Sequence, residues 1–539
     1  MKPASPRALF ISGNAAVDRG ELIAAVDCYR EAVFLNPSFP QAHFNLALLS
    51  KCMGRNEEAI AGFRRALELQ PNNSQAHCHL ADIMHTIGNL EDAADHYREA
   101  LRLDAGLAAA HNNLGNTLRD SGDLPAAISC FRNLVRLCPH LAEGHYNLGS
   151  ALMAMGKTAA ATAALLEAVR LKPDYAGAWN NLGLACKAQT EYSEAIECFS
   201  QALRINPGLA EARWNRAFVR LLTGDFAGGW QDFEARYDLS QWRLFYPFRL
   251  SIPRWAGEPQ PSGTLLVHDE QGLGDTLQFV RYLPWVKQRC ARVIVETQSP
   301  LVELLKDLPG IDEVTARPAQ APVNCMADAH IALMSLPLIF STDLYNIPSV
   351  VPYIWPDIDK RRRWAALFQG PGLKVGIVWA GRPEHHNDKN RSCMLAHFAS
   401  LAHLPGVRLF SLQKGPAVSQ ISENGLQDLI ENLDAELRDF TDTAAILANL
   451  DLLISVDTSV AHLAGAMARP VWLLLPFIPD WRWLLQREDS PWYPTMRLFR
   501  QQRSGDWGSV FRRLEHELQN RTLQTPTTGC GLGLSATRL

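Results

Sequence analysis

A 34-residue periodicity in the N-terminal part constrains the fold of this chain more than any other feature. Proline recurs at Pro37, Pro71, Pro139, Pro173 and Pro207, and glycine at Gly20, Gly54, Gly88, Gly122, Gly156 and Gly224. Alanine recurs at Ala25, Ala59, Ala93, Ala127, Ala161 and Ala195, and an aromatic residue at Tyr29, Phe63, Tyr97, Phe131 and Phe199. Self-similarity at such a period indicates stacked structural repeats.

Each recurring residue has a physical role in a helix pair. Glycine takes the left-handed turn between two helices. Alanine lets the helices approach, the aromatic residue fills the gap between pairs, and proline begins the next unit because it cannot continue a helix. The sequence therefore predicts about six helix pairs over Ala8–Leu222, with a last degenerate helix ending near Tyr237. This pattern resembles a tetratricopeptide repeat (TPR) superhelix.

A further grid places an amide in the first helix of most repeats. Its members are Asn45, Asn113, Asn147, Asn181 and Asn215, with His79 in the sixth place. In TPR superhelices the first helices line the concave groove, where amides would bond the backbone of an extended peptide acceptor. The arrangement resembles the asparagine ladder of the eukaryotic O-linked N-acetylglucosamine transferases. Alternatively, each asparagine bonds the neighbouring repeat or simply tolerates solvent.

Length and composition bound the remaining possibilities. A chain of 539 residues predicts about three domains. A net charge of -4 argues against electrostatic nucleic-acid binding. The sequence shows no secretory signal and no apolar run long enough for a transmembrane segment. The eleven cysteines contain no CxxC pair, so neither a zinc site nor a disulfide framework is indicated. We therefore expect a cytoplasmic protein without a metal site.

The C-terminal part alternates short apolar strands with helices, which is typical of doubly wound α/β domains. The domain layout follows from composition: repeat array 8–237, connector 238–261, first Rossmann-like half 262–345, proline-rich crossing 346–356, second half 357–521 and disordered tail 522–539. The expected strands are Thr264–His268, Arg292–Glu296, Ala329–Leu333, Lys374–Trp379, Arg408–Leu412, Leu452–Val456 and Val471–Leu475. The helix after the first strand is expected to run from Thr276 to Cys290.

One strand–turn–helix unit carries the strongest signal for a ligand. The strand Leu452–Val456 is followed at once by Asp457, Thr458 and Ser459, and then by a helix of small residues. A helix N-terminus beyond the carboxyl end of a strand suits a phosphate. The two hydroxyls would add donors, and Asp457 would hold a sugar hydroxyl. The alternative is an ordinary crossover with a capped helix.

Two motifs give this region a family resemblance. The segment ISVDTSVAHLAGAMARPVWLLL resembles the donor-site signature of heptosyltransferase-like glycosyltransferases, and QGLGD resembles the N-terminal Gly-Asp turn of that family. The resemblance implies a GT-B fold and metal-independent, inverting transfer of a hexosyl, heptosyl or N-acetylhexosaminyl group from a nucleotide-sugar donor. No cofactor is implied. An enzyme similar to the O-linked N-acetylglucosamine transferases is the alternative, although the donor helix of that family differs in sequence.

The resemblance also suggests the acid–base chemistry. Asp275 matches the family aspartate that faces the cleft, so it is the candidate catalytic base for the acceptor hydroxyl. Its alternative role is to cap the helix that follows, and Asp269 and Glu270 lie in the same turn.

Several basic and polar residues are candidates for holding the donor. The loop 380–392 contains Arg382, His385, His386, Lys389 and Arg391, which would clamp a diphosphate or form a solvated surface. Arg382 and Lys389 are favoured, without separating them from Arg391. His462 either faces the diphosphate or is a satisfied helix histidine. Gln413 and Lys414 would contact the base or ribose.

The segment 479–494 is dense in tryptophan and arginine. Its aromatic rings would stack on a sugar or base, with Arg482 meeting a phosphate, or they would pack the two halves together.

Three functions are therefore open. The first is a glycosyltransferase whose protein or peptide acceptor is held by the TPR groove. The second is a TPR scaffold whose transferase-like domain is inactive. The third is an enzyme that modifies a saccharide or lipid precursor, with the repeats serving assembly alone.

Overall fold

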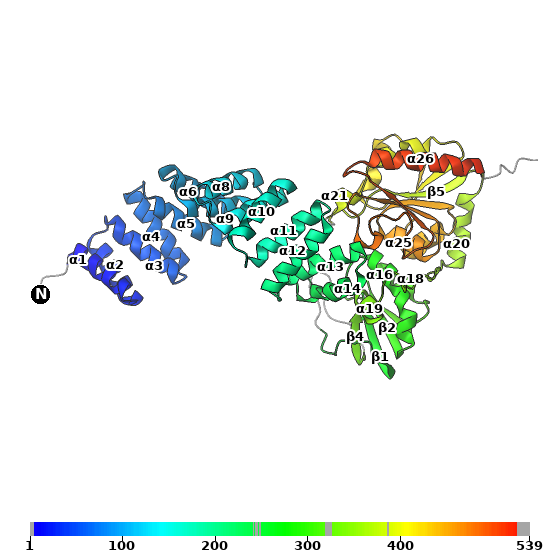
Figure 1. Cartoon of the computed structure of the whole chain (residues 1–539), viewed down its shortest axis with the longest axis horizontal. Coiled ribbons are helices and arrows are strands. Elements are labelled where there is room, and N and C mark those ends of the chain that lie inside the picture. The colour runs from blue at the N-terminus through cyan, green and yellow to red at the C-terminus, as the bar shows by residue number, and fades with distance from the viewer. Residues whose placement is uncertain are drawn as a thin grey trace, which may run out of the picture. The chain divides into compact units, whose positions relative to one another are not determined.

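The computed structural model describes residues 5–240, 242, 246, 250–318, 326–384 and 387–524. The chain divides into two compact units between Leu209 and Ala210. Figure 1 labels many of the helices and strands of both units. No helix among the described residues is long and apolar enough to cross a bilayer.

The first unit consists of helices stacked in antiparallel pairs. Within each pair the first helix has 13 residues and the second has 14. The helices are α1 (Pro6–Asp18), α2 (Leu22–Leu35), α3 (Pro40–Cys52), α4 (Asn56–Leu69), α5 (Ser74–Thr86), α6 (Leu90–Leu103), α7 (Ala108–Asp120), α8 (Leu124–Leu137), α9 (Ala142–Ala154), α10 (Thr158–Leu171), α11 (Ala176–Ala188) and α12 (Tyr192–Ile205). This confirms the helical array that the 34-residue period predicts.

The recurring turn residues have the backbone conformation that the repeat pattern predicts, and glycine also lies where two helices pack closely. The turn glycines have positive φ, for example 76° at Gly20, and Thr190 takes the same conformation with φ 63°. Glycine is also needed where an aromatic ring of the second helix approaches the first. A Cβ on Gly115 would lie 2.5 Å from the Phe131 ring, so only the smallest residue allows this approach.

A recurring side-chain bond to a backbone carbonyl, which was not predicted from the sequence, ties each repeat to the one before it. A histidine of the first helix bonds the carbonyl oxygen six residues earlier, at 2.9–3.2 Å, in four repeats. These residues are His43, His77, His111 and His145. Trp179 continues the grid with a 2.9 Å bond from its indole nitrogen to the Pro173 carbonyl.

The second unit begins with a helical hairpin that still lies on the repeat grid. It comprises α13 (Ala210–Thr223), α14 (Phe226–Phe233) and the 3-10 helix η1 (Glu234–Asp238). The hairpin packs into the α/β region: Trp230 donates to the Thr342 carbonyl at 3.0 Å and contacts Trp481 ring to ring at 5.1 Å. The structure therefore divides the chain after Leu209, whereas the repeat pattern predicts one array up to residue 237.

A four-stranded parallel sheet follows, in the order β3-β2-β1-β4. Its strands are β1 (Gln260–His268), β2 (Cys290–Thr297), β3 (Glu313–Ala316) and β4 (Ala329–Ala332). Its helices are α16 (Leu273–Phe279), η2 (Val280–Tyr282), α17 (Leu283–Lys287), α18 (Ser299–Leu305), η3 (Leu333–Ser335) and α19 (Leu336–Ile339).

A second parallel sheet has six strands in the order β10-β9-β8-β5-β6-β7. Its strands are β5 (Leu373–Val378), β6 (Val407–Ser411), β7 (Ile430–Asn432), β8 (Leu452–Val456), β9 (Val471–Leu475) and β10 (Met496–Arg500). The α-helices are α20 (Ile358–Ala365), α21 (Asp388–Arg391), α22 (Ala399–Ala402), α23 (Gln420–Glu423), α24 (Phe440–Leu447), α25 (Ser459–Ala466) and α26 (Trp507–Gln524), and the 3-10 helices are η4 (Ala366–Phe368), η5 (Leu395–Phe398), η6 (Pro416–Ser419) and η7 (Trp481–Trp483). Two parallel sheets with helical crossovers establish an α/β architecture.

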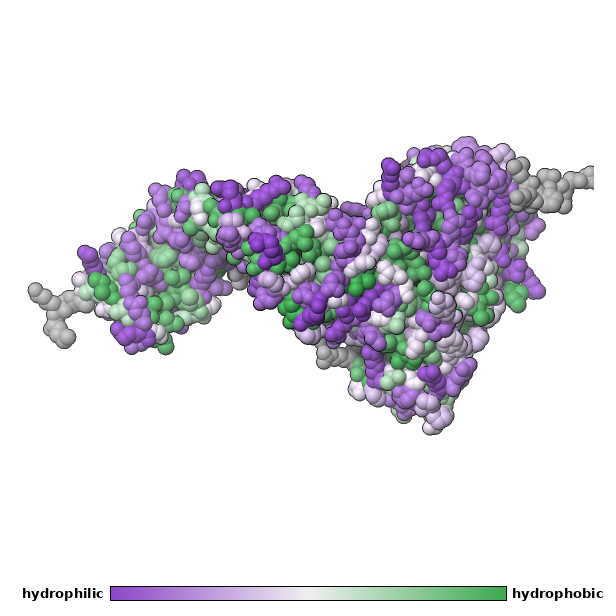
Figure 2. Space-filling view, viewed as in Figure 1, coloured by the Kyte–Doolittle hydropathy of each residue, from purple (hydrophilic) through white to green (hydrophobic). Residues whose placement is uncertain are grey.

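The core of this sheet lies partly under α26. Val510, Phe511, Leu514 and Leu518 of that helix are buried against strand residues such as Trp472 and Phe499. The outer surface around α26 is mostly hydrophilic (Figure 2).

Two parts of the predicted secondary structure need correction. The helix expected over Thr276–Cys290 is divided into α16, η2 and α17, and Pro284 opens the last of these. Strands β3, β7 and β10 are additional to the predicted set. Each lies at a sheet edge and has three to five residues.

Candidate functional site

Two strand–turn–helix units of the second unit face each other. Helix α16 follows β1, helix α25 follows β8, and the two helices pack together. A Cβ on Gly274 would lie 2.9 Å from the His462 ring and 3.6 Å from the Ser459 Cα. The approach of the two turns therefore depends on this glycine. It brings the carboxyl ends of the two sheets to one place, where open α/β folds bind ligands.

Asp275 has two partners in this arrangement. Its Oδ2 accepts a 2.8 Å bond from the Gly272 backbone N–H, so the helix-capping role is observed. Its Oδ1 pairs with Arg482 from the other half. The candidate base is thus held in place by both halves of the unit.

Arg482 is the centre of the polar contacts between the halves. Its guanidinium also donates to Gln278 at 2.6 Å and to Asp480 at 2.9 Å, and it stacks 4.2 Å from the centre of the Trp481 ring. Burial alone would lower the pKa of Arg482, but Asp480, Asp275 and Asp457 raise it above its usual range. A buried, permanently charged guanidinium therefore lies between the two acid-bearing turns.

Asp457 is held at the end of β8. Its Oδ2 accepts a 2.9 Å bond from the Trp483 indole N–H, and its Oδ1 lies 3.5 Å from His462 Nε2. Burial would raise the pKa of Asp457, but His462, Trp483 and Arg391 outweigh it and lower the pKa to about 2. Asp457 is therefore a carboxylate at neutral pH.

The other residues of the donor turn differ in accessibility. His462 is 5% exposed and its Nδ1 lies 2.9 Å from the Tyr493 hydroxyl, so it is bonded inside the fold as the alternative interpretation required. Thr458 is the N-cap residue of α25 without a side-chain capping bond, and its hydroxyl lies 3.0 Å from that of Ser455. Ser459 opens the helix and is partly exposed.

The structure separates the three basic candidates of loop 380–392. Arg391 donates to the Asp457 carbonyl at 3.2 Å, so it lies at the donor turn. Arg382 and Lys389, which the sequence favoured, are exposed, and among the described residues neither makes a hydrogen bond or ion pair to that turn. His385 and His386 lie outside the described residues.

The polar side-chain groups of Gln413 and Lys414 are already bonded elsewhere in the fold. Gln413 is 3% exposed and its amide bonds the backbone at Trp379, Ala380 and Lys414, which links the ends of β5 and β6. Lys414 pairs with Asp434 at 2.9 Å.

The tryptophans of segment 479–494 serve packing. Trp481, Trp483 and Trp492 are buried to 2% exposure or less, and Trp481 and Trp492 contact rings of the helical hairpin. Trp492 also contacts the ring of Phe279 in α16, which supports the interpretation that the segment joins the two halves. Its polar contributions are Arg482 and the indole N–H of Trp483, which donates to Asp457.

The asparagine ladder bonds within the array. The amide nitrogens of Asn45, Asn113, Asn147 and Asn181 each donate to a side chain of the preceding repeat, at 2.9–3.1 Å. His79 contacts Asp82 at 3.7 Å, beside Lys51. Asn215 belongs to the second unit and is partly buried. The inter-repeat alternative is thus observed for four rungs.

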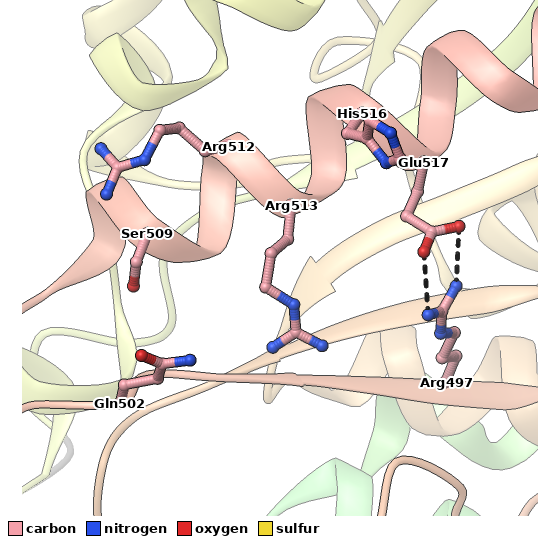
Figure 3. Close-up of a pocket in the computed structure, with 7 residues that line it drawn as sticks. All are labelled: Arg497, Gln502, Ser509, Arg512, Arg513, His516 and Glu517. Carbon is pink, nitrogen blue, oxygen red and sulfur yellow. Dashed lines mark hydrogen bonds and ion pairs between the residues drawn. The ribbon is translucent and has the colours of Figure 1, made fainter.

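Two surface cavities lie away from these residues. One, of about 640 Å³, borders β6, β7 and α23. The other, of about 340 Å³, lies between β10 and α26 and is lined by three arginines (Figure 3). Arg497 bonds Glu517 there, Arg513 pairs with Glu488 at 3.0 Å, and Arg512 points away from Arg497. Most of the positive charge is therefore balanced locally.

Comparison with known proteins identifies the helical region. Models of the tetratricopeptide repeat match residues 53–108 and 146–210, and models described as TPR repeat match 13–50 and 115–156. Protein FlbA of Caulobacter vibrioides is 27% identical over an alignment of 345 residues, which covers 58% of this chain and 55% of FlbA. The chain thus spans about half the length of this curated relative.

Two of the similar solved structures are described as TPR proteins. YrrB, described as a TPR protein with an unusual peptide-binding site, is 22% identical with a TM-score of 0.33, over 34% of this chain and 95% of YrrB. The C-terminal part of a TPR repeat-containing protein from Cytophaga hutchinsonii is 16% identical with a TM-score of 0.37, over 42% of this chain and 94% of that one. The sequence models and the helix pairs agree that the N-terminal region is a tetratricopeptide repeat array.

Proposed function

We propose that this chain is a glycosyltransferase of GT-B type, which transfers a sugar from a nucleotide-sugar donor to a protein recruited by its TPR array. The carrying observation is the meeting of the β1–α16 and β8–α25 turns, with Asp275, Arg482 and Asp457 between them. Two parallel sheets whose carboxyl ends converge suit a donor and an acceptor that react between them.

The chemistry follows from these groups. The acceptor hydroxyl attacks the anomeric carbon and gives its proton to Asp275. A new C–O bond forms as the bond to the diphosphate breaks, and the electron pair leaves with the nucleotide. The N-terminus of α25 and the guanidinium of Arg391 would stabilise the departing negative charge.

Arg482 links donor binding to the base. In the structure its guanidinium occupies Oδ1 of Asp275. A diphosphate is a better bidentate partner for a guanidinium than a single carboxylate oxygen. Donor binding would therefore draw Arg482 from Asp275 and free that oxygen for the acceptor proton.

The array is proposed to recruit the acceptor, since TPR repeats are protein-interaction modules. Four ladder amides already bond neighbouring repeats. They are therefore proposed to fix the register of the array, and recognition falls to the remaining side chains of the first helices.

A nucleotide panel tests the proposal. Purified protein would be heated with nucleoside diphosphates and nucleotide sugars, and a ligand at 100 times its Kd should add about 2.7 kcal/mol of stability. Asp457→Asn and Arg482→Lys should abolish the shift. Asp434→Asn, which changes an aspartate paired with Lys414 at the surface, should keep it. A responding donor is then tested, in labelled form, for transfer to protein.

The alternative is a TPR scaffold with an inactive transferase-like region. It is favoured by the bonds that already occupy Asp275 and Asp457. Absence of any nucleotide shift, together with capture of a protein partner by the full chain, would support it. Transfer to a saccharide or lipid precursor but not to protein would instead assign the repeats to assembly.

A further inference from the structure

The third repeat contains a pair of histidines that the proposed function does not use. His77 lies on α5 and His96 on α6, and their Nδ1 atoms are 3.1 Å apart. The ring centroids are 5.3 Å apart, and both side chains are partly buried. Two ring nitrogens therefore converge on one point between the two helices of the repeat.

The tautomer of His77 is set by the bond to a backbone carbonyl that recurs in the array. Its Nε2 lies 3.2 Å from the Pro71 carbonyl oxygen, which only accepts, so Nε2 carries the hydrogen. In the neutral ring the lone pair is then on Nδ1, the atom that faces His96. A histidine whose other nitrogen donates to a backbone carbonyl is oriented as metal-ligating histidines usually are.

We propose that His77 and His96 bind a divalent transition-metal ion of the Zn²⁺ class through their Nδ1 atoms. Zinc lies about 2.0–2.1 Å from histidine nitrogens. At the observed separation of 3.1 Å, such an ion makes an N–metal–N angle of about 100°, which fits two adjacent positions of a tetrahedral or octahedral ion. The imidazole pair also suits Cu²⁺ and Ni²⁺.

The carboxylates near the two histidines already have bonding partners, so the histidines are the two protein ligands. The charged residues near His96 are Asp92 and Asp95 on its own helix and Arg64 on α4. Asp92 already accepts from Asn89 at 2.7 Å, and Asp95 pairs with Arg98 at 2.8 Å. The described residues contain no cluster of three or more ligating side chains. Solvent therefore completes the coordination, and the affinity is below that of a closed structural zinc site.

The other repeats provide internal controls. The position of His96 is taken by Gly62 in the repeat of His43 and by Ala164 in the repeat of His145, neither of which is a metal ligand. His145 makes the same carbonyl bond as His77, to Pro139 at 2.9 Å. It therefore reproduces the structural role of His77 without a second imidazole.

Calorimetric titration of the full chain with Zn²⁺ tests the site. The wild type should bind one more equivalent than His77→Gln or His96→Gln, and His145→Gln should match the wild type. His96→Cys should restore the equivalent, because a thiolate is also a zinc ligand. Equal stoichiometry in all five proteins, or an equal loss in His145→Gln, would overturn the proposal.

Cu²⁺ provides a readout that is independent of whether the variants fold. The electron paramagnetic resonance spectrum of the wild-type chain with one equivalent of Cu²⁺ should show coupling to two imidazole nitrogens. Coupling to one nitrogen or none would show that the two histidines only bond each other.

Discussion

The repeat array and the α/β unit use polar side chains in opposite ways. In the array a hydrogen bond such as that of His43, His77 and His145 recurs at the same place in successive repeats. In the α/β unit each polar contact is unique, and it often joins distant segments, as Arg482 and Asp275 do across 207 positions. Substitutions at equivalent positions of the array should therefore lower the free energy of unfolding locally and by similar amounts. In the α/β unit each substitution should have its own effect, and that effect should be larger.

The largest effect is expected at a buried ion pair. Arg236 of η1 contacts Glu270 at 2.9 Å, and both side chains are at most 1% exposed. Arg236→Met leaves a buried, unpaired carboxylate, so it should lower the free energy of unfolding by about 3–5 kcal/mol. Tryptophan fluorescence in urea reports this unit, because every tryptophan except Trp179 belongs to it.

The double variant Arg236→Met with Glu270→Gln is the control, since it removes both charges. It should recover part of the lost stability. If the double variant were less stable than Arg236→Met alone, the ion pair would not be the source of the effect.

The next largest effect on the free energy of unfolding is expected on acidification, through protonation of Asp457. Its pKa is lowered from 3.8 to about 2 in the folded protein. The stabilisation, on the order of 2–3 kcal/mol for a shift of nearly two pKa units, is present above pH 4. It is lost as the pH falls toward 2, because protonation favours the unfolded chain. Asp457→Asn should flatten this part of the profile of unfolding free energy against pH, and Asp434→Asn should not.

The two regions also differ in what the sequence reveals. The grid of glycine, alanine and aromatic positions predicts the helix pairs, because each constraint is repeated and local. In the α/β unit the strands with long apolar runs, such as Leu452–Val456, were predicted. The short edge strands β3, β7 and β10 were not, because their pairing partners lie elsewhere in the sequence.

The candidate site shows the same limit. The turns bearing Asp275 and Asp457 follow from local patterns, and so do the loop arginines. The sequence cannot show that Arg391 rather than Arg382 reaches the donor turn, or that Arg482 pairs with Asp275, because these contacts depend on tertiary folding. For the asparagine ladder the period is visible, but the bond of each amide to the preceding repeat is not.

Within the array, packing should matter more than single hydrogen bonds. Gly115→Ala places a methyl group 2.5 Å from the Phe131 ring, so overpacking should cost about 1–3 kcal/mol. In Gly177→Ala the nearest atom is 3.7 Å from the new Cβ, so this variant should be neutral or slightly stabilising. Far-UV circular dichroism during urea unfolding measures both. Equal effects would contradict the proposed ring contact.

The smallest effects are expected at the histidine grid, and they test the comparison most directly. His145→Ala and His43→Ala each remove one bond to a carbonyl, at 2.9 and 3.0 Å, from a partly exposed site. Each should cost about 0.5–1.5 kcal/mol. The two values should agree, because the bonds are equivalent by the repeat. They should also leave the tryptophan-monitored transition of the α/β unit unchanged. A large difference between them, or a shift of that transition, would show that the repeats are not independent and that the contrast between the two regions is wrong.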